Sequence, residues 1–277
     1  MIDLHAHSRA SDGTLAPSDL VRAAHESGLT VLGLTDHDTT DGWEPAAAAL
    51  PAGLTLVRGA EISCTRGGIS LHLLGYLFDP THPALEDRLT QVRISRESRA
   101  QRMVELLAAD GVAVTWDQVH RNAGGTVGRP HVAQALAEAG VVDSLEAAFA
   151  PEWIGTHGRY WVAKDEIDAL EAIALVRAAG GVSVFAHAGA AGRGRIVDDH
   201  VIAQMAAAGL DGLEVDHPDH DGEMRAHLRG VAADLSLLVT GSSDFHGSNK
   251  DVELGANSTA PDQYEALVTR ATGVELL

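Results

Sequence analysis

The stretch MIDLHAHSRASDG, residues 1–13, concentrates metal-ligand side chains at the start of the chain. Its apolar positions predict a short strand over Ile2–His5, and side chains two residues apart on a strand leave the same face. His5 and His7 have this spacing, with which a strand offers two imidazoles to one metal ion. A first strand that carries chance histidines is the alternative explanation, and the rest of the sequence has to decide between the two.

Composition excludes several classes of protein. The 277 residues suffice for one large α/β domain or for a core domain with an insertion, and a 45% apolar share with 29 glycines is typical of a globular chain. No apolar run approaches the roughly 18 residues of a membrane span, and Met1 is followed at once by acidic Asp3 instead of a signal region. Cys64 is the only cysteine, so no internal disulfide forms and we expect a cytoplasmic protein.

The charge balance limits the partners of the chain. It has 20 Lys and Arg residues against 39 Asp and Glu residues, a net charge of −19 with neutral histidines. Such a surface repels duplex nucleic acid, because unspecific binding depends on Lys and Arg contacts to phosphates. An anionic substrate would therefore need a strong local positive centre.

Apolar runs alternate with amphipathic segments along most of the chain. Helical spacing ahead of a glycine predicts helices over Pro17–Ser27 and Val197–Ala208. The alternation favours parallel βαβ units, hence an α/β barrel or a doubly wound sheet. The expected strands are Ile2–His5, Thr30–Thr35, Leu54–Ser63, Ile69–Tyr76, Gly181–Ala186, Gly212–Val215 and Ser236–Thr240.

This rhythm breaks between about Ala84 and Lys164. The segment is mainly helix-like, with one long amphipathic pattern over Leu85–Ala109 and a shorter one over Pro130–Glu138. A helical insertion in an α/β core is the simplest interpretation.

Residues of metal-ligand type recur at the end of nearly every expected strand. The second strand ends in LTDHDT, the third ends in RGAEISC with Glu61 in the same position, and its hairpin-like neighbour is ISLHLLGY. Later strands end in VFAHA, LEVDHPDHD and GSSDFHG. Active sites of α/β folds form at the carboxyl ends of the strands, so this recurrence favours a functional site over packing. The candidate residues are Asp36, His37, Asp38, Glu61, His72, His187, His217, Asp244 and His246.

These motifs, in this order and over nearly the whole chain, resemble the PHP (polymerase and histidinol phosphatase) family. The likeness is closest to its stand-alone phosphoesterases that hydrolyse nucleoside 3′,5′-bisphosphates and RNA 5′ ends, and it includes GRPHVAQALAEAG, residues 128–140. One departure is Ala188 after His187, where relatives often have proline. The resemblance implies a distorted seven-stranded (β/α)7 barrel from residues 1–84 and 165–277, with residues 85–164 as a helical insertion over the active site.

The resemblance also implies up to three metal ions at one mouth of the barrel. Glu61 would bridge a first and a second ion. The mixed imidazole and carboxylate ligands suit Mn²⁺, Fe or Zn²⁺ better than a soft metal. Among these ions Mn²⁺ is the expected one, with Fe or Zn²⁺ as alternatives. Three divalent ions and three carboxylates leave a charge of about +3, enough to attract a phosphate to an acidic protein. The implied ligands are His5, His7, Glu61 and Asp244 for the first ion, Glu61, His72 and His187 for the second, and Asp12, His37 and His246 for the third.

Three further residues are expected on the substrate side. Arg129 and His131 precede a helical pattern, and a helix N-terminus beside an arginine is a phosphate site, although a surface ion pair would also explain Arg129. His217 follows a strand and could act as an acid toward the leaving oxygen. We therefore expect metal-activated hydroxide to remove the 3′-phosphate of nucleoside 3′,5′-bisphosphates, and stepwise trimming of short RNA from its 5′ end. The sequence leaves the oligomeric state open.

Most other polar residues are expected to lie on the solvent-exposed surface. A nucleotide could be guided by the arginines at every third position, but a solvated, salt-bridged face is the preferred interpretation. We expect Lys164 to be exposed and Cys64 to be a small buried residue. The arginines are Arg93, Arg96, Arg99 and Arg102, and the surface histidines are His25, His82, His120, His157, His200, His220 and His227.

Three alternatives remain. Hydrolysis of histidinol phosphate, or of another small phosphomonoester, lies within the resembled family. An amidohydrolase-type enzyme also opens with His-x-His, but SDG, a bridging Glu61 and the DFH ending have no place in its pattern. A non-catalytic module that keeps the barrel would have lost ligands, whereas all nine positions carry competent residues.

Overall fold

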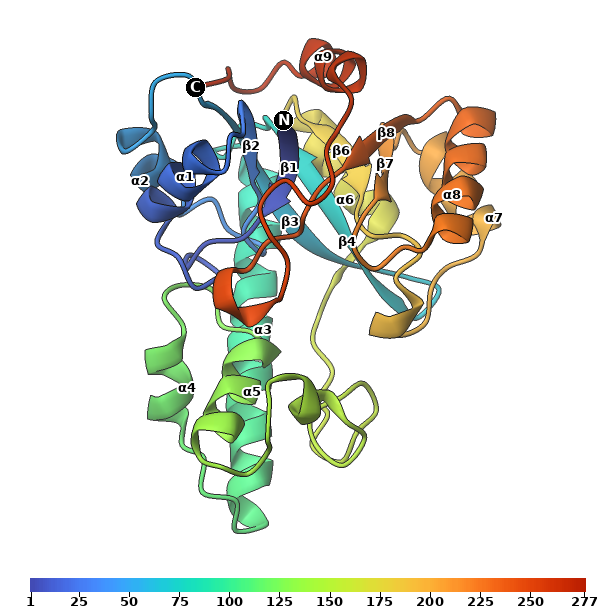
Figure 1. Cartoon of the computed structure of the whole chain (residues 1–277). Coiled ribbons are helices and arrows are strands. Elements are labelled where there is room, and N and C mark those ends of the chain that lie inside the picture. The colour runs from blue at the N-terminus through green and yellow to red at the C-terminus, as the bar shows by residue number, and fades with distance from the viewer.

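The computed structural model describes residues 1–277, apart from the side chain of Arg193 (Figure 1). The strands are β1 Ile2–Ala6, β2 Val31–Leu34, β3 Thr55–Arg66, β4 Ile69–Tyr76, β5 Ile167–Asp168, β6 Val182–Phe185, β7 Gly212–Asp216 and β8 Leu238–Gly241. The α-helices are α1 Pro17–Glu26, α2 Trp43–Ala48, α3 Pro83–Ala109, α4 Trp116–Asn122, α5 Arg129–Glu138, α6 Ala169–Ala178, α7 Asp199–Ala207, α8 Gly222–Leu235 and α9 Pro261–Arg270. Short 3-10 helices lie at Glu146–Phe149, Ala191–Arg193 and Gly247–Asn249.

The strands form a nearly closed barrel. They pair in the order β1-β2-β3-β4-β6-β7-β8, and the short β5 pairs with β3. Neighbours run parallel except around β4, which is antiparallel to both β3 and β6. A bridge between Ala6 and Phe245 brings the first strand next to the chain that follows the last. The predicted distorted seven-stranded α/β barrel is therefore confirmed, and the doubly wound sheet was the wrong alternative.

The expected strands match the observed ones closely, but β3 is longer than predicted. It continues to Arg66, so Glu61 lies inside a strand and not at its end. The reason is a change of partner: parallel pairing with β2 stops at Arg58, while antiparallel pairing with β4 continues. Glu61 therefore lies level with His37, to which it is bridged, just beyond the end of β2. The two-residue β5 was missed because it is too short for a periodic signal.

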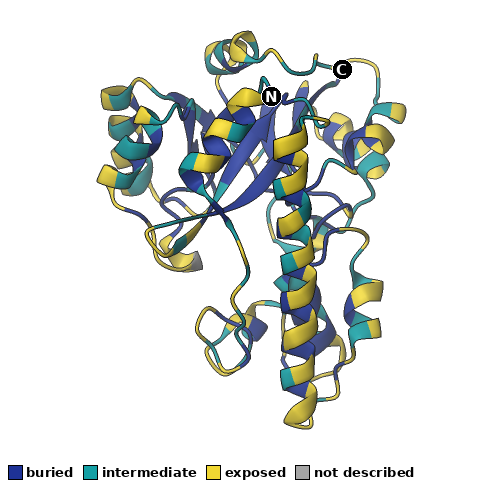
Figure 2. Ribbon diagram, turned by 180° about the vertical axis from the view of Figure 1, so that it is seen from behind, coloured by how far each residue is buried: buried dark blue, intermediate teal, exposed yellow. Residues whose placement is uncertain are grey.

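Helix α3 connects two hydrophobic cores. Leu85, Leu89 and Val92 in its first half pack into the cluster that includes the helices around the barrel. Met103 and Leu107 in its second half belong to a separate cluster with residues from α4 and α5. Figure 2 shows the exposed outer face of this helix and its buried side toward the neighbouring elements. The segment expected to be an insertion thus has a hydrophobic core of its own.

The α4–α5 segment lies below the barrel in Figure 1, on the side opposite the two chain termini. The residues just before α5 contact the loop after β1 closely. A Cβ on Gly125 would lie 2.1 Å from the backbone oxygen of Ala10, and the Thr126 amide donates to that oxygen at 2.8 Å. Gly125 therefore lets the segment rest on the loop that carries Asp12. No helix among the described residues is long and apolar enough to cross a membrane.

Candidate metal centre

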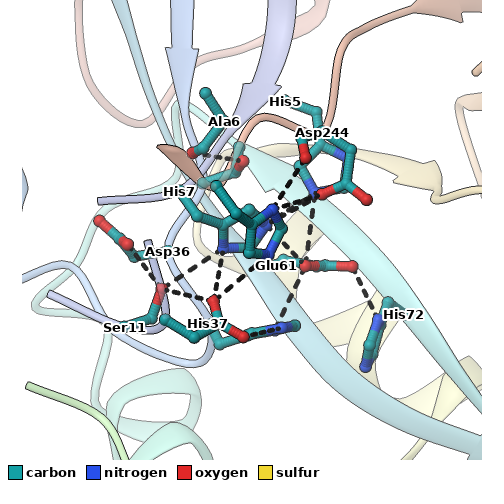
Figure 3. Close-up of polar contacts among 12 residues, drawn as sticks. His5, Ala6, His7, Ser11, Asp36, His37, Glu61, His72 and Asp244 are labelled. Carbon is teal, nitrogen blue, oxygen red and sulfur yellow. Dashed lines mark hydrogen bonds and ion pairs between the residues drawn. The ribbon is translucent and has the colours of Figure 1, made fainter. Parts of the chain in front are cut away.

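His5 on β1 and His7 just beyond it start the site, as Figure 3 shows. Their Nε2 atoms lie 3.0 Å apart, and both side chains are fully buried. Glu61 Oε2 lies 3.3 Å from His5 Nε2 and 3.0 Å from His7 Nε2, and Asp244 Oδ1 lies 3.4 Å from each. One atom from each residue falls within 4.8 Å of the others, so the structure brings the first predicted ligand group together.

The second carboxylate oxygen of Glu61 faces a different pair of histidines. Oε1 lies 2.7 Å from His72 Nδ1 and 2.9 Å from His187 Nε2, and these two nitrogens are 3.4 Å apart. Each oxygen of Glu61 thus serves its own group of imidazoles. This is the arrangement expected of a carboxylate that bridges two ions.

Asp12 gathers the third group. It lies 3.4 Å from His7 Nδ1, 3.6 Å from His37 Nε2 and 3.4 Å from His246 Nε2. His37 was expected to serve this group alone, but its Nδ1 also lies 3.2 Å from Glu61 Oε2. It also forms a group with Glu61 and His72, so it stands between the second and third groups, and the three groups overlap through shared residues.

The donor set fits divalent cations. His37 Nδ1 is buried and has no hydrogen-bond partner among the described residues, because its 3.2 Å approach to Glu61 lacks hydrogen-bond geometry. Burial lowers the pKa of His37 well below its usual value, against the pull of Glu61 and Asp12, so the ring is neutral and offers lone pairs. Nitrogen and carboxylate oxygen donors without a thiolate suit Mn²⁺, Fe or Zn²⁺. The residues present therefore fit the metal ions that the resemblance implies.

The carboxylates around His7 and His5 raise the pKa values of both imidazoles. Burial alone would lower the pKa of His7, but Asp244, Glu61 and Asp12 outweigh it and raise the value to about 9. The pKa of His5 is likewise raised, against burial, chiefly by Glu214, Asp244 and Glu61. Such a surplus of negative charge around two imidazoles is what a cation would neutralise.

Comparisons with known proteins show the family of the chain. A family model described as PHP domain matches residues 3–175, more than half of the chain. The chain belongs to the PHP domain family. It is 35% identical over 262 residues to the 5′-3′ exoribonuclease of Haemophilus influenzae, which covers 92% of this chain and 93% of the relative. It is 34% identical over 253 residues to the 3′,5′-nucleoside bisphosphate phosphatase of Chromobacterium violaceum, with 88% and 87% covered.

A solved structure extends the likeness to the fold. A protein from Bifidobacterium adolescentis, assigned to the metal-dependent phosphoesterases, superimposes with a TM-score of 0.91 at 39% identity. The match covers 98% of this chain and 96% of that one. The predicted family and hydrolase class are thereby confirmed.

Glu214 on β7 supports this PHP centre and was missed from the sequence. Its Oε1 lies 2.9 Å from His5 Nδ1, and its Oε2 accepts the His187 amide at 2.7 Å. The Ser242 hydroxyl also donates to Oε1. A carboxylate behind a ligand histidine fixes the orientation of the ring. The available signal was an acidic residue inside the apolar strand GLEVD.

Asp36 is a second buried support. It accepts the Ser8 amide at 2.8 Å and the Ser11 hydroxyl at 2.6 Å, and Ser11 Oγ lies 3.3 Å from His7 Nδ1. A Cβ on Gly13 would lie 2.3 Å from the His7 carbonyl oxygen, so the SDG turn requires glycine there. The strand-end aspartate and the SDG motif thus hold His7 and Asp12 in place.

Three residues at the mouth have backbones that only glycine adopts readily. Asp38, His187 and Asp244 have φ angles of 55°, 33° and 52°. Such strain persists only where the surroundings determine the conformation, and it is common at functional sites. For Asp244 one contact is Lys250, a further residue that the sequence did not single out, whose Nζ lies 2.6 Å from Oδ2.

His217, expected on the substrate side, is fully buried next to the first group. Its Nε2 lies 3.3 Å from Asp244 Oδ2, and its Nδ1 accepts the Asp219 amide at 3.0 Å. Because Nδ1 is an acceptor, the proton of the neutral ring is on Nε2. The guanidinium of Arg225 donates to the His217 carbonyl at 2.8 Å and holds this loop.

The two insertion residues differ in their surroundings. Arg129, the first residue of α5, is half-buried, with its guanidinium near the Thr156 hydroxyl at 3.4 Å and over the ring of Phe149 at 5.6 Å. His131 is buried, and its Nδ1 accepts the Gly128 amide at 2.9 Å. His131 therefore caps the start of α5, and that nitrogen is not offered to a ligand.

Three surface assignments were wrong. Arg96 and Arg99 are buried instead of forming a solvated face, while Arg102 is exposed as expected. The Lys164 side chain is only 8% exposed. His220 is buried, where its Nδ1 faces the Val215 carbonyl and its Nε2 accepts the Gly189 amide. In each case contacts from another part of the chain cover the side chain, which local sequence does not reveal. Cys64 is buried, as predicted.

Proposed function

We propose that the protein removes the 3′-phosphate from nucleoside 3′,5′-bisphosphates and trims short RNA from its 5′ end. The observation that carries the proposal is Glu61, whose two oxygens each face a separate group of histidines. A site for adjacent divalent ions suits the hydrolysis of phosphate esters. The exoribonuclease and the nucleoside bisphosphate phosphatase named above support it, because both names describe hydrolysis of a phosphate ester of RNA or of a nucleotide.

We assign the metal ligands as the sequence predicted them. Two to three divalent ions, which we propose to be Mn²⁺ with Fe or Zn²⁺ as alternatives, would supply an activated water and positive charge for the phosphate. The first ion would be held by His5, His7, Glu61 and Asp244. The second would be held by Glu61, His72 and His187, and the third by Asp12, His37 and His246.

The chain's own groups would act around the phosphate. His217 would hold its Nε2 proton toward the leaving oxygen, since Nδ1 is occupied by the Asp219 amide. Glu214 would keep His5 and the His187 backbone in place. Arg129 would contact a phosphate away from the reacting centre, while His131 would position α5. We further propose that residues 85–164 form an insertion that covers the mouth, and that the protein is cytoplasmic.

The test is a substrate panel with the full-length protein loaded separately with Mn²⁺, Fe²⁺ or Zn²⁺. Adenosine 3′,5′-bisphosphate should be turned over with a higher kcat/KM than histidinol phosphate or other small monoesters. An isotopically chiral phosphorothioate ester should be hydrolysed with inversion at phosphorus, because water attacks directly, whereas a phospho-enzyme intermediate would give retention. A higher kcat/KM for histidinol phosphate would overturn the choice of substrate, and no activity on any ester would overturn the phosphoesterase itself.

A further inference from the structure

Asp244 presents its two carboxylate oxygens to different neighbours. Oδ1 faces His5 and His7 of the first metal group, and Figure 3 shows Asp244 next to these two residues. Oδ2 instead faces the ammonium of Lys250 at 2.6 Å and Nε2 of His217 at 3.3 Å. Because the two oxygens share one carbon, the ammonium lies beside the place where the first ion would be held. A cation of the chain itself thus borders the metal centre.

The segment that carries Lys250 is held in place by its other residues. The Ser248 amide donates to the Thr14 hydroxyl oxygen at 3.0 Å, and the Asn249 side-chain amide donates to the Asp12 carbonyl at 2.9 Å. The position of the segment therefore does not depend on the lysine alone. The Lys250 side chain is 31% exposed, whereas the carboxylate that it contacts is 2% exposed. The ammonium thus lies at the boundary between the buried centre and solvent.

The ammonium of Lys250 has capacity for a further partner. It has three N–H donors and no acceptor. One donor reaches Asp244 Oδ2 at 2.6 Å, and a second lies at the limit of a hydrogen bond to the Asp244 carbonyl, at 3.5 Å. These are the contacts that the ammonium makes among the described residues, so at least one N–H is left for a ligand.

The charges favour an anion as that ligand. The ammonium of Lys250 compensates the Asp244 carboxylate in their ion pair. A divalent ion at Oδ1 would compensate the same carboxylate a second time, so the positive charge of the lysine would become available to a bound phosphate. Lysine suits this role, because its ammonium is a compact charge on a flexible stem and its donors can turn from one partner to another.

We propose that Lys250 contacts a non-bridging oxygen of the phosphate at the metal centre and thereby favours a terminal phosphate over an internucleotide diester. A terminal phosphate carries close to two negative charges at neutral pH and a diester carries one, so an adjacent cation stabilises the terminal phosphate more. The inference rests on the proposed function and ranks its two reactions. The 3′-phosphate of a nucleoside bisphosphate is the preferred target, and the trimming of RNA is the slower reaction.

Inorganic phosphate, a product of the reaction, tests the contact without any turnover. Titration calorimetry on the metal-loaded, full-length protein should show that Lys250→Met weakens phosphate binding about 10- to 100-fold, as for loss of a charge-assisted contact. Lys250→Arg should recover part of the affinity. Metal content after dialysis should stay as in the wild type in both variants, because the ligand side chains are unchanged. Arg22→Met is the control for net charge, since Arg22 pairs with Asp19 on α1 and is 55% exposed.

Substrate preference gives the second measurement. The ratio of kcat/KM for adenosine 3′,5′-bisphosphate to that for a 5′-phosphorylated dinucleotide should fall about tenfold or more in Lys250→Met, return in part in Lys250→Arg and stay as in the wild type in Arg22→Met. Circular dichroism confirms that each variant is folded, and Lys250 lies outside helices and strands.

Two results would overturn the inference. One is an unchanged affinity for phosphate in folded, metal-loaded Lys250→Met. The other is a loss of metal in Lys250→Met with an unchanged ratio of the two substrates, because a lysine that only positions Asp244 would give this result. A wild type inactive on both esters would instead overturn the proposed function, and the phosphate titration would still decide whether Lys250 makes the contact.

Discussion

Arg96 on α3 and Asp38 beyond β2 form a buried ion pair, with 2.5 Å between Nε and Oδ2 and side chains 5% and 0% exposed. The same carboxylate accepts the Ser63 amide at 2.7 Å. Asp38 follows His37 and has a left-handed backbone, so this pair holds a strained residue of the mouth against the long helix. The arginine that reaches across from α3 thus joins the metal centre to the α3–α5 segment.

Arg96→Met should destabilise the protein by about 3–5 kcal/mol, because it leaves Asp38 buried without its partner. The double variant Arg96→Met/Asp38→Asn should recover part of this loss, since the unpaired charge is gone. Urea unfolding of the two variants and of Asp38→Asn gives the free energies. Additive effects of the two substitutions would show that the pair is not coupled.

Asp244→Asn should weaken the first metal group while the fold stays intact, because Asp244 Oδ1 faces both His5 and His7. We expect lower metal content after dialysis, lower turnover and a nearly unchanged circular dichroism spectrum. Asp251→Asn, at an exposed position beyond the mouth, is the control. Full turnover of Asp244→Asn at saturating metal would contradict the assignment.

Glu214→Gln should reduce the affinity for the first metal ion about 10- to 100-fold, because the amide no longer fixes His5 through a charged acceptor. Competition with a fluorescent chelator measures the dissociation constant. Glu223→Gln, in the exposed first turn of α8, should leave it as in the wild type. An equal loss in both variants would mean that overall charge, and not the contact with His5, is responsible.

The stability of the metal-free protein should be highest near pH 6.5. Burial, with the charges of Lys250 and His7, lowers the pKa of His246 to about 4, so unfolding takes up a proton and stability falls as pH drops from about 6.5 toward 4. His7 has a raised pKa of about 9, so its contribution is complete below about 6.5 and is lost as pH rises toward 9.

Thermal unfolding at a series of pH values measures both the acid limb and the alkaline limb of this dependence of stability on pH. Saturating metal should remove the alkaline limb, because a metal-bound imidazole has already lost its proton. A melting temperature that stays constant between pH 7 and 9 without metal would contradict the raised pKa of His7.

The sequence by itself determined the class of fold and the set of candidate ligand residues. Strand alternation is a local pattern, and a residue near the end of a parallel strand reaches the same mouth as its neighbours, so His5, His37 and His187 were predictable from position alone. The motif order supplied the family. Glu61 was recognised although its strand continues to Arg66, because its place level with the end of β2 does not depend on where β3 stops.

Only the tertiary structure decided which side chains are shared and which charges are buried. Every third residue of a helix turns back by about 60°, so the arginine row of α3 passes from one face to the other, and nothing local marks the face that the barrel covers. Contacts with distant Asp38 bury Arg96, while Arg102 on the same row stays in water. The support that Glu214 gives to His5 joins residues 209 positions apart, and such a contact exists only after the barrel has nearly closed.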